Sequence, residues 1–206
     1  MAQNKDAGLN GSASGKRASH QEEKSVISYL HDIVCLVAGM MLVFSLLLRV
    51  VVVTGPSMNK TLYDGDWLLL LSNVFYKDPK PGDIIVAAKS DFEDGTPIIK
   101  RVIATEGQTV DIDFQEGVVY VDGTALDEPY TNTMTNLSEG AEFPLTVKEN
   151  CIFVLGDNRN LSKDSRSTEI GQIDKRQVLG RALVLVVPGT SGGMVSRDFS
   201  RIRFFF

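Results

Sequence analysis

The sequence predicts a mostly β domain carried on a single N-terminal membrane-spanning helix. Three observations support this fold class: a charge-free apolar run, a polar leader before it, and a later series of short β-type runs separated by turn dipeptides. The boundaries follow from these changes in composition. We expect a leader at 1–28, an anchor at 29–53, a β-rich domain at 54–188 and a tail at 189–206.

The leader is rich in Ser, Gly, Ala, Asn and charge, and it has almost no large apolar residues. Such a segment cannot bury enough apolar surface to offset the entropy of ordering, so we expect it to be disordered. Lys16, Arg17 and Lys24 precede the apolar run, whereas only Arg49 and Lys60 closely follow it. The positive-inside rule therefore favours a cytoplasmic N-terminus and an extracytoplasmic β-rich domain.

The apolar run extends from Ile33 to Leu48, is interrupted by Arg49 and resumes at 50–53. A stretch of roughly 20 apolar residues spans a bilayer if Arg49 extends its charge to the interface. A buried core helix is one alternative, although the run lacks the polar face of a surface helix. A cleaved secretory signal is the other, but no A-x-A sequence follows the run.

After the anchor, the chain changes to short runs rich in β-branched residues, which are typical of strands. Turn dipeptides such as Asp64-Gly65, Pro81-Gly82 and Asp122-Gly123 separate these runs. We expect strands at residues 67–71, 83–88, 98–104, 109–113, 118–121, 151–155 and 179–187. No internal repeat is present.

Two segments fall outside this pattern of strands. Residues 127–150 are polar with scattered apolar positions, which predicts a long loop of the kind that often carries recognition. The tail closes with Arg201-Ile202-Arg203 and three phenylalanines. Aromatic residues beside arginines predict either a contact with the membrane interface or packing against the domain.

The composition argues against several function classes. The net charge is −5 and the chain has no basic stripe, so the electrostatic footprint of nucleic-acid binding is missing. Cys35 lies in the apolar run and Cys151 in the β-rich part, so we expect no disulfide between them. Cys151 has no His or Cys neighbour in sequence, and we expect neither a metal site nor another cofactor.

A candidate nucleophile, Ser57, lies a few residues after the apolar run. A serine hydroxyl is a poor nucleophile until a base removes its proton, and both histidines, His20 and His31, lie before the domain. A lysine can replace histidine where burial leaves its amine neutral. Lys100 fits this role, because it follows Ile98 and Ile99 within an expected strand.

A third polar segment, GDNRNLSKDSR from Gly156 to Arg166, directly follows the strand expected at 151–155. A solvated loop would explain its charges but not the order in which small, acidic and basic residues occur. A lone serine and a lone lysine are found in nearly every protein. The third segment is therefore what makes the pairing of Ser57 with Lys100 informative.

Together these segments resemble bacterial type I signal peptidases, membrane-bound serine proteases that remove signal peptides from exported proteins. The resemblance extends from Ile33 to Pro188 and is carried by Ser57-Met58, Lys100-Arg101-Val102-Ile103 and the segment from Gly156 to Arg166. It implies a signal-peptidase-like β-fold on one anchor, in the cell membrane. Gly55 resembles the Gram-positive branch, since other members have a serine at that position.

The resemblance implies a Ser/Lys dyad in which Ser57 attacks the scissile carbonyl and Lys100 is the general base. The backbone N–H of Ser57 would stabilise the oxyanion. Gly55 has no hydroxyl to add, so a backbone amide, such as that of Gly55, or water would be the second donor. Supporting residues would hold the base in place: Ser162 would hydrogen-bond Lys100, Asp164 would pair with Arg166, and Asp157 would pair with Arg101.

The implied substrates are signal-peptide-bearing pre-proteins cut after small residues, the A-x-A pattern, which requires shallow apolar pockets. A β-edge beside Ser57 would hold the substrate as an added strand. Membrane lipid and the secretion translocon are the further partners implied. By resemblance, the pocket residues are Val51, Val53, Met58, Leu62, Ile98 and Ile99; for each of them, ordinary core packing is the alternative.

Two other function classes stay open. A LexA-type self-cleaving repressor also uses a Ser/Lys dyad on a related β fold, but it needs a DNA-binding domain where this chain has a leader and an apolar run. A non-catalytic membrane-anchored assembly or chaperone-like module would use the same fold for binding. The presence of both Ser57 and Lys100 argues against that module, since a pure binder has no need to bury a neutral lysine.

Overall fold

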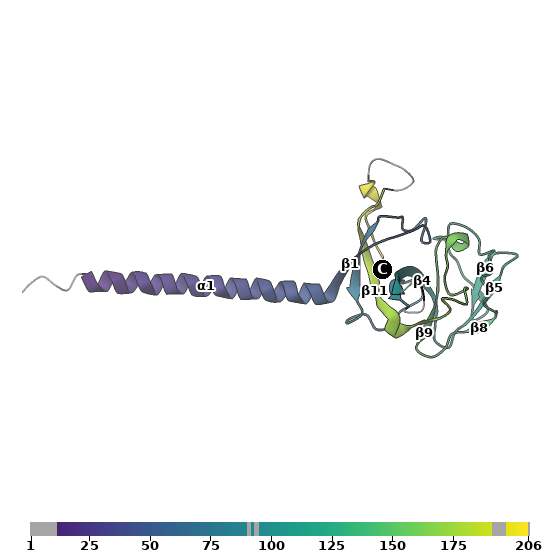
Figure 1. Cartoon of the computed structure of the whole chain (residues 1–206), viewed down its shortest axis with the longest axis horizontal. Helices are drawn as coiled ribbons and strands as arrows, with labels where there is room; N and C mark the ends of the chain where they lie inside the picture. Colours follow the sequence, from purple (N-terminus) through teal and green to yellow (C-terminus); the bar gives the residue numbers. More distant parts are fainter. Residues whose placement is uncertain (1–11, 90–91, 93–94, 191–196, 206) are drawn as a thin grey trace, which may run out of the picture. The chain divides into compact units, whose positions relative to one another are not determined.

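The N-terminal part of the chain is one long helix, α1 (Ser12–Leu47), in a computed structural model that describes residues 12–89, 92, 95–190 and 197–205 (Figure 1). Its stretch Val26–Leu47 is 22 residues long, has a mean hydropathy of 2.2 and is 0% buried. Because a core helix would be buried, the apolar run is a helix with the length and composition of a membrane span. The chain divides at Ser45 and Leu46 into this helical unit and a β-rich unit.

Two expectations about the N-terminal part are wrong. Residues 12–28 belong to α1 rather than to a disordered leader, while residues 1–11 lie outside the described part of the chain. The helix also ends before the expected limit of the anchor, and β1 (Leu48–Val52) follows it at once. β1 pairs with β2 from Leu48↔Leu71 to Val52↔Trp67. Its valines favour a strand once a partner strand is available, and only the tertiary fold provides that partner.

The β-rich unit contains an 8-stranded antiparallel sheet in the order β1-β2-β11-β3-β4-β9-β10, with β12 paired to β11. All of the strands expected from the sequence are present in the two sheets. The further members of this sheet are β2 (Trp67–Ser72), β3 (Ile84–Ala88), β4 (Pro97–Thr105), β9 (Cys151–Leu155), β10 (Ile173–Asp174), β11 (Val178–Val187) and β12 (Arg203–Phe204).

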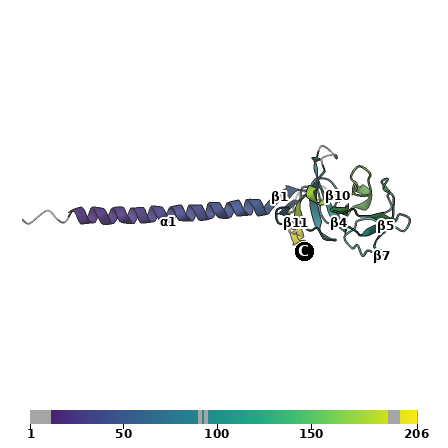
Figure 2. The ribbon, with the colours of Figure 1, turned by 90° about the horizontal axis from the view of Figure 1, so that it is seen from below.

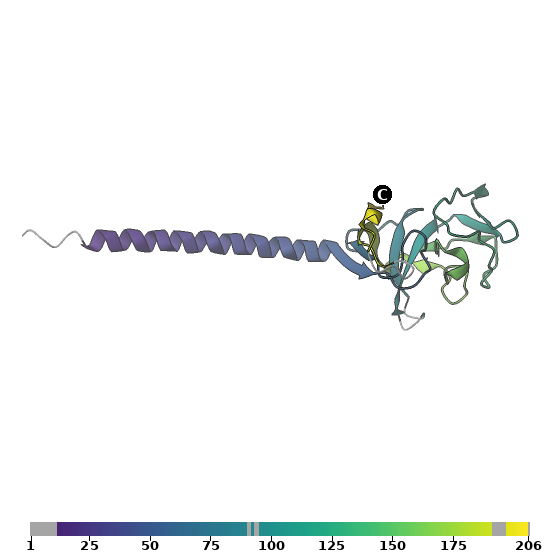
Figure 3. The ribbon, with the colours of Figure 1, turned by 90° about the horizontal axis from the view of Figure 1, so that it is seen from above.

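A second sheet of 4 strands, in the order β7-β6-β5-β8, lies at one end of the β-rich unit (Figures 1, 2 and 3). Short 3-10 helices occur at Arg159–Leu161, Lys175–Gln177 and Phe199–Arg201. The strands of this sheet are β5 (Thr109–Asp113), β6 (Val118–Val121), β7 (Thr124–Ala125) and β8 (Leu145–Thr146).

The tail returns to the domain, as one of its two expectations proposed. β12 pairs with β11 at Val184↔Phe204 and Leu185↔Arg203. Arg201 is ion-paired with the buried Asp66 at 2.6 Å. Packing against the domain is therefore confirmed for the described part of the tail, whereas residues 191–196 and Phe206 lie outside it.

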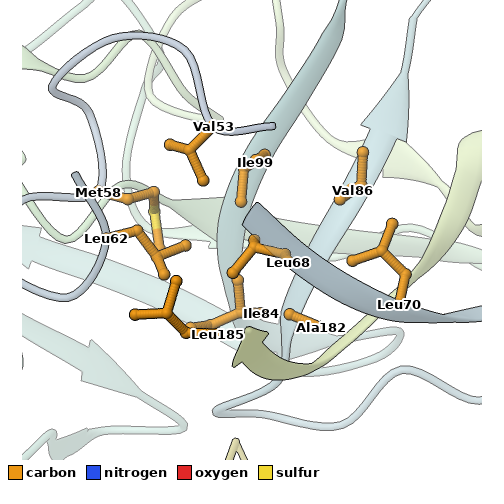
Figure 4. Packing of buried hydrophobic residues seen from close by; sticks show 10 residues of the cluster. All are labelled: Val53, Met58, Leu62, Leu68, Leu70, Ile84, Val86, Ile99, Ala182 and Leu185. Carbon is orange, nitrogen blue, oxygen red and sulfur yellow. The ribbon is translucent and has the colours of Figure 1, made fainter. Parts of the chain in front are cut away.

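One buried cluster holds the segment that contains Ser57. Met58 and Leu62, from the turn after Ser57, insert among residues of β2, β3, β4 and β11 (Figure 4). Burying a Met or Leu side chain stabilises a fold by about 1.5–3 kcal/mol. The position of Ser57 is thus tied to the core of the large sheet. The cluster comprises Val53, Met58, Leu62, Leu68, Leu70, Ile84, Val86, Ile99, Ala182 and Leu185.

Candidate active site

The backbone of the Ser57 segment is held from both sides. Met58 accepts hydrogen bonds through its carbonyl from the N–H groups of Thr61 and Leu62, each at 2.8 Å, which closes a tight turn after the serine. On the other side, Asn158 donates its backbone N–H to the Ser57 carbonyl at 3.0 Å and its side-chain amide to the Pro56 carbonyl at 3.1 Å. The segment from Gly156 to Arg166 therefore fixes the nucleophile loop directly.

Lys100 on β4 reaches the Ser57 hydroxyl. Its Nζ donates to Ser57 Oγ at 2.9 Å, and the residue is 4% exposed. Burial lowers the pKa of Lys100 to about 8, against opposing attraction from Asp164, Glu139 and Asp157. A lysine in this state loses its proton near neutral pH, and the neutral amine can then accept the hydroxyl proton of Ser57.

Asp157 and Arg101 form a two-bond ion pair beside the dyad. Arg101 donates from Nε to Asp157 Oδ1 at 2.8 Å and from Nη2 to Oδ2 at 2.7 Å. Arg101 also donates to the Gly82 carbonyl at 2.9 Å and lies 3.9 Å over the Tyr130 ring. Such bidentate pairs fix orientation as well as charge. The expected pairing of Asp157 with Arg101 is therefore present.

Asp164 and Arg166 form a second pair, in which both side chains are 0% exposed. Arg166 donates from Nε and Nη2 to the Asp164 carboxylate at 2.8 and 2.9 Å. Asp164 also accepts from the Gly156 N–H at 3.0 Å, and Arg166 donates to the Ser162 carbonyl at 3.2 Å. The pair therefore closes the Gly156–Arg166 segment upon itself and keeps both charges satisfied inside the protein.

Ser162 does not make the expected hydrogen bond. Its Oγ is buried and has no hydrogen-bond partner among the described residues. The side chain packs instead against Gly156, where an added Cβ would lie 2.1 Å from Ser162 Oγ and 2.6 Å from the Ser57 carbonyl oxygen. Gly156 is needed at this position because any side chain would collide with the nucleophile segment.

The backbone of Gly55 is not the second oxyanion donor. Its N–H donates to Asp64 Oδ1 at 2.8 Å, and its φ of +85° suits glycine. The N–H of Ser57, in contrast, donates to no described residue. Ser57 thus keeps a free backbone donor beside its own hydroxyl, as an oxyanion site requires.

A cleft of about 390 Å³ opens beside Ser57 and Lys100. Five of the expected pocket residues line it, but Leu62 does not, because it is 0% exposed within the core cluster. Phe92, Thr96, Pro97 and Lys163 line the cleft in addition. The expected residues that do so are Val51, Val53, Met58, Ile98 and Ile99.

No individual role was predicted for Asn158 and Arg159 from the sequence, and the structure places both in contacts that hold the site. Arg159 is 1% exposed, pairs with Glu128 at 2.5 Å and donates to Thr135 Oγ1 at 2.6 Å. It therefore ties the loop at 127–150 to the site. The one available signal was the place of both residues inside the Gly156–Arg166 segment. In the described part of the chain, no group of three or more His, Cys, Asp or Glu could hold a metal ion.

A protein-family model described as "Signal peptidase, peptidase S26" matches residues 26–187. The chain belongs to this signal peptidase family. Signal peptidase I of Bacillus licheniformis is 31% identical over 178 residues, which are 82% of this chain and 93% of that protein. Probable signal peptidase I-1 of Synechocystis is 34% identical over 169 residues, covering 75% and 81%.

Signal peptidase I S of Bacillus subtilis is 29% identical over 182 residues, covering 84% of this chain and 95% of that protein. The similarity to Bacillus proteins agrees with the resemblance to the Gram-positive branch. The chain is thus an enzyme, a membrane-anchored serine endopeptidase of the signal peptidase I type, and its substrates are signal-peptide-bearing pre-proteins. Neither a non-catalytic module nor a self-cleaving repressor fits this family. The match to the family ends at residue 187, before the tail.

Proposed function

We propose that Ser57 is the nucleophile and Lys100 the general base of this signal peptidase, and that it cuts after small residues in an A-x-A pattern. The observation that carries the proposal is the 2.9 Å distance between Lys100 Nζ and Ser57 Oγ. Both groups border the cleft, and no histidine is part of the β-rich unit. Asp157, Arg101, Asp164 and Arg166 then act by holding the segments that carry the dyad, whereas Ser162 Oγ makes no hydrogen bond with a described residue.

The reaction proceeds through an acyl-enzyme. Lys100 Nζ takes the proton of Ser57 Oγ as this oxygen bonds to the scissile carbonyl carbon, and the Ser57 N–H donates to the resulting oxyanion. When the tetrahedral intermediate collapses, the C–N bond breaks and Lys100 gives its proton to the leaving amine. Lys100 then takes a proton from water as the water oxygen bonds to the ester carbonyl carbon. The C–Oγ bond breaks, the acid product leaves, and Lys100 returns the proton to Ser57 Oγ.

The edge of β4 beside the cleft favours a substrate bound as a strand. β4 pairs with β3 along residues 97–101, whereas β9 pairs with β4 only from Arg101 to Thr105. Residues 97–100 therefore have one backbone edge that is unpaired within the described chain, and residues 51–55 line the same cleft. An extended peptide between these segments gains main-chain hydrogen bonds from β4.

The apolar lining limits what the peptide can carry near the scissile bond. Ile98, Ile99, Val51, Val53 and Met58 are branched or bulky. Ile99, Val53 and Met58 are also buried in the core cluster, so their positions are fixed. Pockets built from such side chains accept a small methyl group and exclude larger groups by overlap. This lining supports the proposed preference for alanine near the scissile bond.

We further propose that the N-terminus is cytoplasmic and that the β-rich unit lies on the extracytoplasmic side of the membrane. The support is the excess of Lys and Arg before the apolar stretch. The apolar helix would contact membrane lipid. The enzyme would lie close to the secretion translocon, because pre-proteins reach it through the translocon. Tethering raises the effective concentration of enzyme and substrate at the bilayer surface.

The test uses the full chain in detergent with a pre-protein substrate, and the cut is mapped by mass spectrometry. Ser57→Ala and Lys100→Ala are expected to abolish cleavage after a small residue. Lys60→Ala, which removes an exposed lysine close to the same turn, is the matched control and should keep activity. Unchanged cleavage by a folded Ser57→Ala or Lys100→Ala protein would refute the dyad.

A further inference from the structure

A second cleft, of about 420 Å³, shares none of its lining residues with the cleft beside Ser57. It lies between the turn at Thr61, the start of β3 and the C-terminal strand β12. Three arginines line it, Arg101 on β4, Arg181 on β11 and Arg203 on β12. The cleft is therefore the place where segments distant in sequence bring guanidinium groups together.

The three guanidinium groups differ in how their charge is balanced. Arg101 has a bidentate partner in Asp157. Arg181 Nε lies 3.0 Å from Asp83 Oδ1, but its N–H is not directed at that oxygen and makes no hydrogen bond. The Asp83 carboxylate is also shared between Arg181 and Tyr76, since its Oδ2 accepts a hydrogen bond from the Tyr76 hydroxyl at 2.6 Å.

Arg203 is the least balanced of the three. Its Nη2 donates to the carbonyl of Thr61, and no carboxylate among the described residues pairs with it. Burial and the nearby charges of Arg201 and Arg101 lower the pKa of Arg203. The carboxylates of Asp157 and Asp66 act in the opposite direction without pairing with Arg203, and an anion bound beside Arg203 would add to their effect.

Phe204 and Phe205 of the C-terminal segment form one part of the lining of the cleft, which we call its rim. Phe204 lines the cleft and is 64% exposed, and Phe199 and Ile202 in the same C-terminal segment are 59% and 46% exposed. Phe205 lies under Arg203, with 5.3 Å between the guanidinium carbon and the ring centroid. Cationic donors inside and exposed apolar side chains at the rim together suit a molecule with an anionic head and an apolar part.

We propose that this cleft binds a phosphate group, and that Arg203 and Arg181 are its principal donors. Guanidinium groups match phosphate oxygens in a fork geometry that a compact ammonium does not offer. The apolar rim favours a phospholipid headgroup over free phosphate. Three of the lining residues, Arg203, Phe204 and Phe205, lie beyond the residues that the family model matches. The proposal does not rest on the assignment of the dyad.

The experiment measures binding to the full chain in a neutral detergent by thermal shift, since a ligand raises the melting temperature according to its occupancy. The probes are inorganic phosphate, dihexanoyl phosphatidic acid, dihexanoyl phosphatidylcholine and acetate. Saturable binding of phosphatidic acid is expected, and the affinity for acetate should be at least about tenfold lower. If phosphatidic acid binds more tightly than inorganic phosphate, the cleft is a site for a lipid headgroup. If the two affinities are equal, it is a site for soluble phosphate.

Arg203→Gln is expected to lower the affinity for the phosphate probes by at least about tenfold. Arg203→Lys should lower it by less, because the positive charge remains while the forked guanidinium geometry is lost. Arg197→Gln removes the same charge from an exposed position in the same segment and should leave the affinity within about twofold. Ser57→Ala should bind as the unchanged protein does. Equal losses in Arg203→Gln and Arg197→Gln, no saturable phosphate binding, or acetate binding as tight as phosphate would each overturn the proposal.

Discussion

The two clefts hold their cations in opposite ways. Beside Ser57, one lysine is 4% exposed, and burial lowers its pKa to about 8. In the second cleft, Arg101 is paired with Asp157, Arg181 lies beside the carboxylate of Asp83, and Arg203 lies beside an aromatic ring with no carboxylate partner among the described residues. A lysine can lose its proton under such conditions and an arginine cannot. The proposed base and the proposed binding site thus differ in whether the cation can release its proton.

The largest effect is expected from placing an arginine in the catalytic cleft. Lys100→Arg keeps a long cation near Ser57 but removes the group that can accept a proton, so kcat/KM should fall by roughly 10²–10⁴-fold. Cleavage of a pre-protein measured against the unchanged enzyme checks this. Arg203→Lys, the reverse exchange in the second cleft, should leave kcat within a few-fold. Retained activity in Lys100→Arg would show that proton transfer by Lys100 is not required.

A second prediction concerns the buried ion pair that closes the Gly156–Arg166 segment. Asp164→Asn leaves Arg166 charged at 0% exposure without its carboxylate, which should lower the free energy of unfolding by about 3–5 kcal/mol. Denaturant unfolding measures the change. Asp174→Asn alters a pair whose Arg176 is 89% exposed and should leave the unfolding midpoint unchanged. Equal effects of the two substitutions would contradict the importance of burial.

Gly156→Ala should have an intermediate effect. The new Cβ would lie 2.6 Å from the Ser57 carbonyl oxygen, so the nucleophile segment must move. We expect a loss of about 1–3 kcal/mol in stability, together with a lower kcat. Gly39→Ala, where an added Cβ meets nothing within 4 Å, is the control. If kcat and the unfolding midpoint are both unchanged in Gly156→Ala, the close packing against Ser57 does not constrain the site.

The smallest expected effect is on the pH profile. Since the neutral amine of Lys100 is the active form, kcat/KM should rise about tenfold per pH unit below the pKa of about 8 and level off above it. Glu139 stabilises the ammonium, so Glu139→Gln should lower the pKa of Lys100 and move the rising limb to lower pH, by up to about one unit. Glu142→Gln, at an exposed position, should not move the limb. A shift to higher pH in Glu139→Gln would refute the role of this carboxylate.

Much of the fold could be predicted from the sequence because it depends on local patterns. Runs such as 67–71 and 151–155 alternate with turn dipeptides, and each forms a strand. The contact between Ser57 and Lys100 could also be expected, since both occur in short segments with a characteristic order. The C-terminal limit of the anchor could not be predicted from the sequence, because Leu48–Val52 continues the apolar composition of the helix. This segment becomes a strand only through pairing with β2.

The sequence by itself determined which residues are available for chemistry: a serine after an apolar helix, a lysine in a β-branched strand and a polar segment rich in paired charges. Only the tertiary structure decided which of them meet. It placed Asn158 on the Ser57 backbone, buried Leu62 away from the cleft and left Ser162 Oγ without a partner. It also joined Arg101, Arg181 and Arg203 in one cleft. Contacts between residues this far apart depend on strand order and packing, which local sequence patterns do not encode.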